Sequence, residues 1–159
     1  KNSVWAASTI LISRRPAVAD IQQDYGAAAF ALGMSGAATI GNGVSGLSDA
    51  LDNRTRKFLD YHIMVGVTTG GSATATGLIE IYVKGSVDGV VYEDDGNDRW
   101  IGTITLAAAG AQTRNRLVSI AAAFNGGVPP FTRLRLRNAT GAALADATAT
   151  VIGISGETV

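Results

Sequence analysis

The residues that could carry acid–base or metal chemistry are scarce in this chain. His62 is the only histidine, and the 159 residues include no cysteine. A general base must lie within hydrogen-bonding distance of a nucleophile, and the sequence pairs His62 with none. A single imidazole without thiolates is also a poor ligand set for a transition metal. We therefore expect a surface or interface histidine, and no catalytic residue, cofactor or metal ion.

An acidic run, Glu-Asp-Asp-Gly-Asn-Asp at residues 93–98, follows shortly after Asp88. Carboxylate oxygens are the ligands that calcium prefers, but the distal glutamate of an EF-hand loop is missing. Two carboxylates can also flank a sugar bond in a glycosidase, although rigid elements hold catalytic acids better than a flexible loop does. Acidic turns are usually solvated. A solvated turn is the favoured interpretation, with calcium binding and glycoside hydrolysis as alternatives.

The strongest charge feature is an arginine ladder on a predicted strand at residues 131–137, where arginines alternate with leucines. Three guanidinium groups would project from one side at a spacing of about 6 to 7 Å, which suits carboxylates or phosphates of a partner. A solvated face that discourages edge-to-edge aggregation explains the pattern equally well. Our candidates for a protein interface are Arg133, Arg135, Arg137, Arg114, Arg116, Trp5, Arg14 and Arg15.

Aromatic residues make up only 6% of the chain. Exposed aromatic rings could form a stacking platform for a sugar, and the candidates are Trp5, Tyr82, Tyr92 and Trp100. Burial is the commoner fate of aromatic side chains. A carbohydrate-binding module is therefore an alternative to a protein-binding role.

The elements that must position these residues show a period-two alternation of apolar and polar side chains, which is typical of half-buried strands. Residues 78–92 predict a central hairpin with its turn at residues 85–89, and we expect Trp100 on the same face as Ile104 and Leu106. Seven or eight strands joined by short turns favour an all-β fold, an antiparallel β-sandwich that is jelly-roll-like. The predicted strands cover residues 3–13, 59–67, 78–84, 90–92, 100–106, 118–124, 131–137 and 147–154.

The N-terminal third shows weaker patterns. Ile21, Tyr25 and Ala28 could form one face of a short helix, and residues 33–46 are rich in glycine and alanine, as in a flexible segment. We predict an extended N-terminal strand and flexible arm over residues 1–50, and a single sandwich body over residues 51–159. No transmembrane helix or targeting signal is expected.

The overall charge restricts the classes of partner. Lysine plus arginine and aspartate plus glutamate both number 13, so the formal net charge is zero. Such a chain has no overall field that would attract nucleic acid or an anionic membrane. We expect neither direct nucleic-acid binding nor membrane association.

Three features, in this order, resemble small structural proteins of tailed bacteriophage virions. They are a strand ending in Ser-x-Asp-Gly-x-x-Tyr at residues 86–92, prolines before the basic strand, and Asn-x-Thr-Gly at residues 138–141. The similarity covers about residues 50–155. It implies a non-enzymatic, jelly-roll-like protein of a particle, either a capsid decoration protein or a head-stabilising protein.

Three functional hypotheses follow from the residues and this resemblance. The first is a virion protein, assembled in the host cytoplasm, that forms a homo-oligomer such as a trimer or a symmetric ring. It would bind other virion proteins, such as the major capsid protein, through its arm and one sheet face. The second is a tail or fibre component, or a carbohydrate-binding adhesion module. The third is a hydrolase, for which only the acidic run and His62 are available.

Overall fold

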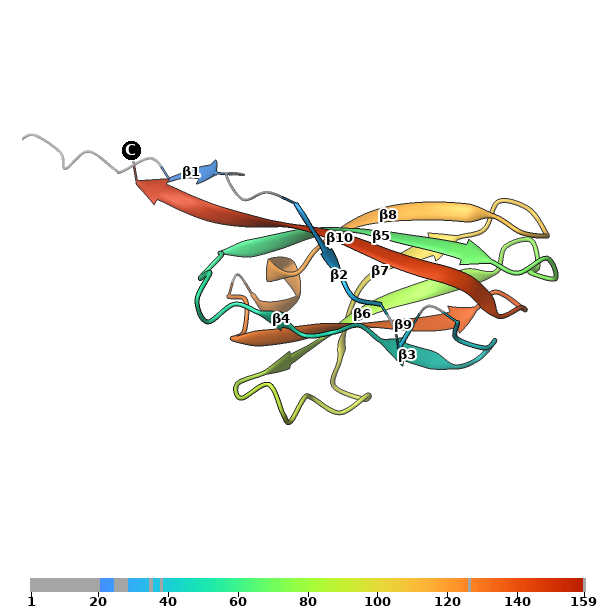
Figure 1. Ribbon diagram of the computed structural model, residues 1–159, viewed down its shortest axis with the longest axis horizontal. Helices are drawn as coiled ribbons and strands as arrows, with labels where there is room; N and C mark the ends of the chain where they lie inside the picture. The colour runs from blue at the N-terminus through green and yellow to red at the C-terminus, as the bar shows by residue number, and fades with distance from the viewer. Residues whose placement is uncertain (1–20, 25–28, 35, 38, 126, 159) are drawn as a thin grey trace, which may run out of the picture.

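The computed structural model describes residues 21–24, 29–34, 36–37, 39–125 and 127–158. The regular elements in these residues are β-strands and one short 3-10 helix, η1 (Figure 1). No helix in this part of the chain is long and apolar enough to span a membrane. In chain order the elements are β1 (Ile21–Asp24), β2 (Phe30–Leu32), β3 (Ser45–Leu47), β4 (Leu51–Asp52), β5 (Asp60–Thr69), β6 (Leu78–Ser86), β7 (Arg99–Thr105), β8 (Thr113–Ser119), η1 (Ala121–Phe124), β9 (Phe131–Ala139) and β10 (Leu144–Thr158).

The strands pair in a nested, antiparallel order. β2 pairs with β10, β3 with β9, β5 with β8, and β6 with β7. Because β10 also pairs with β5, and β9 with β6, two sheets form with the orders β2-β10-β5-β8 and β3-β9-β6-β7. Pairing of the first strand with the last, and so on inward, is the strand order of a jelly roll. The predicted all-β, antiparallel sandwich is confirmed.

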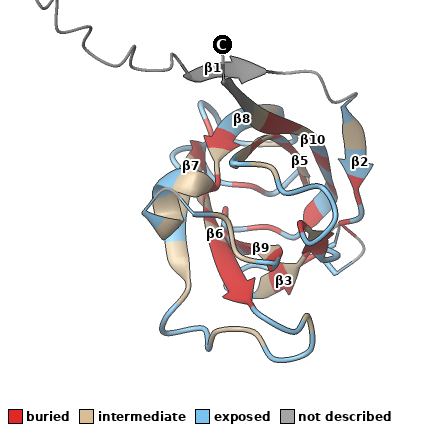
Figure 2. Ribbon diagram, turned by 90° about the vertical axis from the view of Figure 1, so that its left-hand side faces the viewer, coloured by how far each residue is buried: buried red, intermediate tan, exposed pale blue. Residues whose placement is uncertain are grey.

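The hydrophobic core lies between the two sheets, whose strands carry most of the buried residues (Figure 2). Full burial of a valine, leucine or isoleucine side chain stabilises the fold by about 1.5–3 kcal/mol, so these positions hold the sheets together. Alternate residues of β5, β6 and β9 face inward and are at most 1% exposed: Ile63, Val65, Val67, Ile79, Ile81, Val83, Leu134 and Leu136.

Most of residues 30–50 belong to the sandwich and not to a flexible arm. β2 and β3 each extend a sheet, and the side chains of Leu32, Met34, Ala37 and Ile40 are buried in the core. The small residues of this segment permit close packing, since a Cβ atom at Gly46 would lie only 2.1 Å from the carbonyl oxygen of Gly36. The predicted boundary at residue 50 therefore falls inside the body. The helix expected around residues 21–28 is also wrong where the chain is described, because residues 21–24 form β1.

The Asn-x-Thr-Gly turn between β9 and β10 anchors this segment. Asn138 is fully buried, and its Nδ2 atom donates to the carbonyl oxygens of Ile40 and Ala142 at 3.0 and 2.7 Å. Its Oδ1 atom accepts the hydroxyl proton of Thr140 at 2.7 Å. Gly141 has a φ of +85°, in the left-handed region that favours glycine. The motif therefore closes a turn and fixes residues 40–44 to the body.

Two of the predicted strands differ in the structure: one lies in a loop, and the other ends early. Val90 to Tyr92 lie in a long loop, and the return strand β7 begins only at Arg99. The backbone N–H groups of Val90 and Val91 donate to the Asp88 carboxylate at 2.8 and 2.9 Å. These N–H groups are therefore not available for the hydrogen bonds between paired strands.

The strand predicted at residues 118–124 ends early. β8 stops at Ser119 and the 3-10 helix η1 follows. Asp60 Oδ1 accepts the N–H groups of Ile120 and Ala121 at 3.0 and 2.7 Å. A carboxylate that binds free N–H groups in this way stabilises the start of a helical turn.

A bulge in β7 reverses the expected orientation of Trp100. Ile81 pairs with Gly102, whereas Tyr82 pairs with Trp100, so Ile101 is an extra residue. An extra residue moves the preceding side chain to the other face of a strand. Trp100 is 60% exposed, while Ile104 is buried. The prediction that they share a face is wrong.

The last strand extends past the sandwich. Ile154 of β10 pairs with Asp60, the first residue of β5. The following residues, 155–158, pair only with β1 among the described strands. β1 and the end of β10 form a two-stranded ribbon that projects beyond the other strands (Figure 1).

Candidate protein interface

The arginine ladder lies on the outer face of the β3-β9-β6-β7 sheet. The leucines between the arginines point into the core, so the arginines point outward. On the neighbouring strand β6, Glu80, Tyr82 and Lys84 lie opposite Arg137, Arg135 and Arg133. The sequence prediction that the ladder occupies one face is confirmed by these positions.

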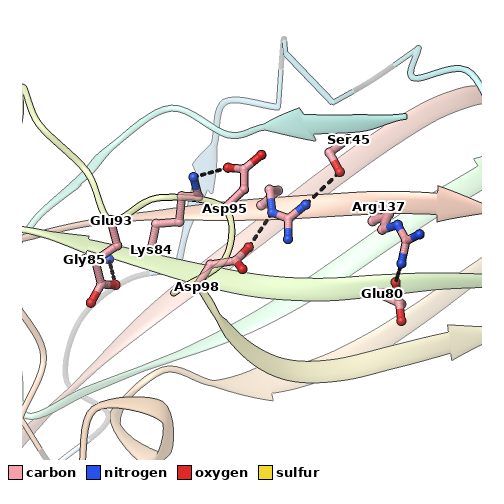
Figure 3. Close-up of polar contacts among 9 residues, drawn as sticks. Ser45, Glu80, Lys84, Gly85, Glu93, Asp95, Asp98 and Arg137 are labelled. Atoms are coloured by element: carbon pink, nitrogen blue, oxygen red, sulfur yellow. Dashed lines mark hydrogen bonds and ion pairs between the residues drawn. The ribbon is translucent and has the colours of Figure 1, made fainter. Parts of the chain in front are cut away.

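The loop between β6 and β7, residues 87–98, carries the acidic run and folds back over this face. Asp95 forms an ion pair with Lys84, Asp98 with Arg135, and Glu93 with Arg99 at the start of β7. Figure 3 shows Asp95 beside Lys84, and Glu93 beside the backbone of Gly85, whose N–H it accepts at 2.8 Å. The acidic run is thus not simply a solvated turn.

The pair of Asp98 and Arg135 is the most enclosed of these contacts. The side chains are 3% and 11% exposed. Arg135 also donates to Ser45 Oγ at 2.9 Å, and its guanidinium carbon lies 4.5 Å from the centre of the Tyr82 ring. Burial lowers the pKa of Arg135, but the hydrogen bond and charge of Asp98 outweigh burial, so the pKa is raised overall. Asp98 therefore stabilises the charge of a mostly buried guanidinium group.

Glu93 and Asp95 are held in their charged forms. The hydrogen bond from Arg99 lowers the pKa of Glu93, against the opposing effect of burial. The hydrogen bond and charge of Lys84 lower the pKa of Asp95. The oxygens of both carboxylates form ion pairs with cations of the same chain. In the described residues, no group of three or more histidine, aspartate or glutamate side chains could hold a metal ion.

Two of the three ladder arginines, Arg135 and Arg137, form ion pairs with carboxylates of the same chain. Arg133 stacks over the Tyr92 ring, with 4.6 Å from its guanidinium carbon to the ring centre. Arg137 has the most exposed side chain of the three, at 52%, and pairs with Glu80 at 2.9 Å (Figure 3). Of the three, Arg137 remains most accessible to another molecule.

The remaining candidates do not join the ladder. Arg114 and Arg116 lie on β8 in the other sheet, opposite Val67 and Val65. Their side chains lie on the same face of the sheet as those valines, at the edge of the sandwich. Arg116 lies beside Gly102 of β7 there. The other three candidates, Trp5, Arg14 and Arg15, lie outside the described residues.

His62 lies beside a serine and a carboxylate, in an order unsuited to nucleophilic catalysis. Asp60 Oδ2 accepts the hydroxyl proton of Ser119 at 2.6 Å and lies 3.4 Å from His62 Nε2. A triad needs the imidazole between the hydroxyl and the carboxylate, whereas here the carboxylate lies between the other two groups. Since Asp60 also binds the first N–H groups of η1, this cluster joins β5 to the end of β8.

The β6–β7 loop carries an exposed apolar surface that the alternation of residues did not predict. Val87, Val90 and Val91, here called the valine tip, are 82%, 82% and 72% exposed. Hydrogen bonds from Val90 and Val91 to Asp88 hold this tip and lower the pKa of that carboxyl, and Gly89, at φ +77°, packs against Phe131. In the sequence, the indication of this surface is a valine-rich turn directly before the acidic run. This turn falls within the predicted hairpin.

An open pocket of about 410 Å³ adjoins the valine tip. Val87, Val91, Tyr92, Phe124 and Pro129 give the pocket its apolar lining, and the ion pair of Glu93 and Arg99 also borders it. Phe124 belongs to η1 and Pro129 precedes β9, so three separate parts of the chain build this surface. Apolar pockets of this size hold a side chain as large as an aromatic ring.

The aromatic residues do not gather into a sugar-binding platform within the described chain. Tyr82 and Tyr92 lie beneath Arg135 and Arg133. Trp100 is exposed, and its Nε1 atom donates to Thr103 Oγ1 at 3.1 Å. Of Tyr82, Tyr92 and Trp100, it is therefore Trp100 whose ring is exposed to a ligand.

Comparison of the chain with protein-family models found no match, and comparison with curated proteins found no significant similarity.

Proposed function

We propose that this protein is a non-enzymatic structural protein of a tailed-phage virion, a capsid decoration or head-stabilising protein that self-associates and binds coat subunits. The observation that carries the binding role is the valine tip. Its three valine side chains are 72–82% exposed, and they lie on a loop that ion pairs hold against the sheet. Several exposed apolar side chains on one loop beside a pocket are typical of a protein–protein contact.

The fold and the sequence resemblance support the virion assignment. Jelly rolls are common in viral capsid proteins, and also occur in lectins and cupins, so fold alone does not decide the function. The phage-like motifs at residues 86–92 and 138–141 have structural roles here, since Asp88 braces the valine tip and Asn138 anchors residues 40–44. They therefore support a shared architecture with small virion proteins.

The test is the copy number and position of the protein in purified phage particles that contain it. Quantitative mass spectrometry should give a fixed ratio to the major capsid protein, and electron cryomicroscopy should place the jelly roll on the head surface. Recombinant protein should also bind, saturably, to heads from which it has been removed. A few copies at the tail, or no binding to these heads, would contradict the head assignment.

A second candidate function, glycan adhesion, is favoured only by the exposed Trp100. A glycan array should then show saturable binding that is lost in Trp100→Ala. Leu117→Ala removes an exposed apolar side chain from the other sheet and is the matched control. Binding that is absent, or equally affected by both variants, would remove this candidate.

A further inference from the structure

The valine tip and its pocket form a preorganised apolar surface without a cover in the described chain. The loop that carries them is fixed by the ion pairs of Glu93, Asp95 and Asp98 and by the Asp88 hydrogen bonds. A surface that is already ordered loses little conformational entropy when it binds. The geometry therefore favours an extended apolar segment that can lie along the tip and place one large side chain in the pocket.

The sequence preceding β1 contains a segment of this kind. From Asn2 to Ser13 the chain has no charged residue, and residues 9–12 read Thr-Ile-Leu-Ile. Trp5 supplies a large aromatic side chain. Such β-branched and aromatic residues favour an extended conformation, and their apolar area is stabilised by removal from water. The segment matches the chemistry of the valine tip and pocket.

The direction of β1 takes its N-terminal end away from the sandwich. Asp24 pairs with Ser155, close to the sandwich, whereas Ile21 pairs with Thr158, farther along the ribbon. Followed toward its N-terminus, the chain therefore leaves the sandwich (Figure 1). The 20 residues before β1 span up to about 66 Å when fully extended.

We propose that residues 3–13 of one copy dock on the valine tip of a neighbouring copy, with Trp5 in the pocket beside Phe124. This proposal rests on the proposed function in one respect, self-association, and names the contact that produces it. Each copy both gives a segment and receives one, so the contact is heterologous and closes into a ring when the rotation between copies permits.

Cysteine cross-linking tests the contact directly, because the native chain has no cysteine. Chains carrying Ser8→Cys and Val90→Cys are mixed at equal concentration, with one of them isotopically labelled, and oxidised under mild conditions. We expect a disulfide between residue 8 of one chain and residue 90 of the other, identified by peptide mass spectrometry. Val44→Cys is the matched control, because Val44 is 53% exposed and bonds Asn138, near the end of β9 opposite the tip.

A second measurement uses chains without cysteine. Sedimentation of the full-length protein should show that Trp5→Ser and Val90→Asp each weaken self-association by about tenfold or more. Val44→Asp should leave it unchanged. Val90 is 82% exposed, so its substitution leaves the core intact; thermal unfolding checks this.

The outcomes separate this inference from the proposed function. A third chain carries both Ser8→Cys and Val90→Cys. If a disulfide formed within this chain but not between the two single-cysteine chains, the segment would dock on its own copy, and the proposal would be overturned. Oligomers that persist unchanged in Trp5→Ser and Val90→Asp would also overturn it, although self-association itself would then stand. A chain that is monomeric at all concentrations would overturn both the contact and self-association. Cross-linked oligomers that fail to bind phage heads would support the contact and contradict the decoration role.

Discussion

At the residue scale, Asp98 and Arg135 form an ion pair that water barely reaches. Asp98 is 3% exposed, and Arg135 is packed between Ser45 and the Tyr82 ring. The cost of removing both charges from water is offset only while the pair is intact. This pair attaches the loop of residues 87–98 to the sheet, and through the loop it positions the valine tip.

We predict that Asp98→Asn destabilises the protein by about 3 kcal/mol, because it leaves Arg135 buried without a counter-ion. Urea unfolding monitored by fluorescence measures the change, with the slope against urea expected to stay constant. The matched control is Glu80→Gln, which breaks the more exposed pair with Arg137 and should cost less than about 1 kcal/mol. Equal effects of the two variants would contradict the enclosed role of Asp98.

At the scale of elements, the loop of residues 87–98 acts as an ionic strap across the sheet. Its carboxylates bind Lys84, Arg99 and Arg135, which belong to three different strands. Charge-assisted hydrogen bonds of this kind are stronger than neutral ones. The strap explains how a long loop without strand pairing holds one conformation, and it makes that conformation sensitive to acid.

We predict that acidification weakens the strap. The pKa values of Glu93 and Asp95 are lowered in the folded protein from ordinary values of 4.5 and 3.8. A lowered pKa gives stability that is present above the ordinary value and lost as the pH falls through the folded value. The free energy of unfolding should therefore decrease as the pH falls below about 4.5, and Glu93→Gln should make this decrease smaller.

Urea unfolding at a series of pH values between neutral and strongly acidic measures this effect. Asp94→Asn is the control, because Asp94 lies on the same loop but outside its three ion pairs. If Asp94→Asn reduced the acid dependence as much as Glu93→Gln, general loop charge and not the Arg99 contact would be responsible.

At the scale of the whole molecule, the nested jelly roll uses strands from both ends of the described chain. β2 and β3 pair with β10 and β9, so residues 30–50 are required to complete both sheets. The buried side chains of Leu32, Met34 and Ile40 add to the same core. The part of the chain available for reaching a neighbour therefore ends well before residue 50.

We predict that removal of residues 1–20 leaves a cooperatively folding body that has lost self-association. Removal of residues 1–50 should instead prevent stable folding, because it deletes the three strands β1, β2 and β3 and several buried side chains, each worth about 2 kcal/mol or more. Circular dichroism during heating and sedimentation measure both properties. A folded, cooperative protein starting at residue 51 would contradict the place of β2 and β3 in the core.

The sequence by itself determined the fold class and the inward residues of the regular strands. In β5, β6 and β9, apolar and polar residues alternate. Because successive side chains of a strand point to opposite faces, this alternation determines which face is buried. It also placed Arg133, Arg135 and Arg137 together on the opposite face of β9. These properties depend on neighbours along the chain, which a single sequence contains.

Only the tertiary structure decided the state of those residues. The acidic run pairs with Arg135 because a loop folds onto the ladder, the described part of residues 33–46 is packed because β9 and β10 lie beside it, and Trp100 is exposed because β7 has a bulge. Each outcome depends on contacts between segments far apart in the chain. Burial and charge pairing are set by such contacts, and local alternation carries no information about which distant segment supplies them.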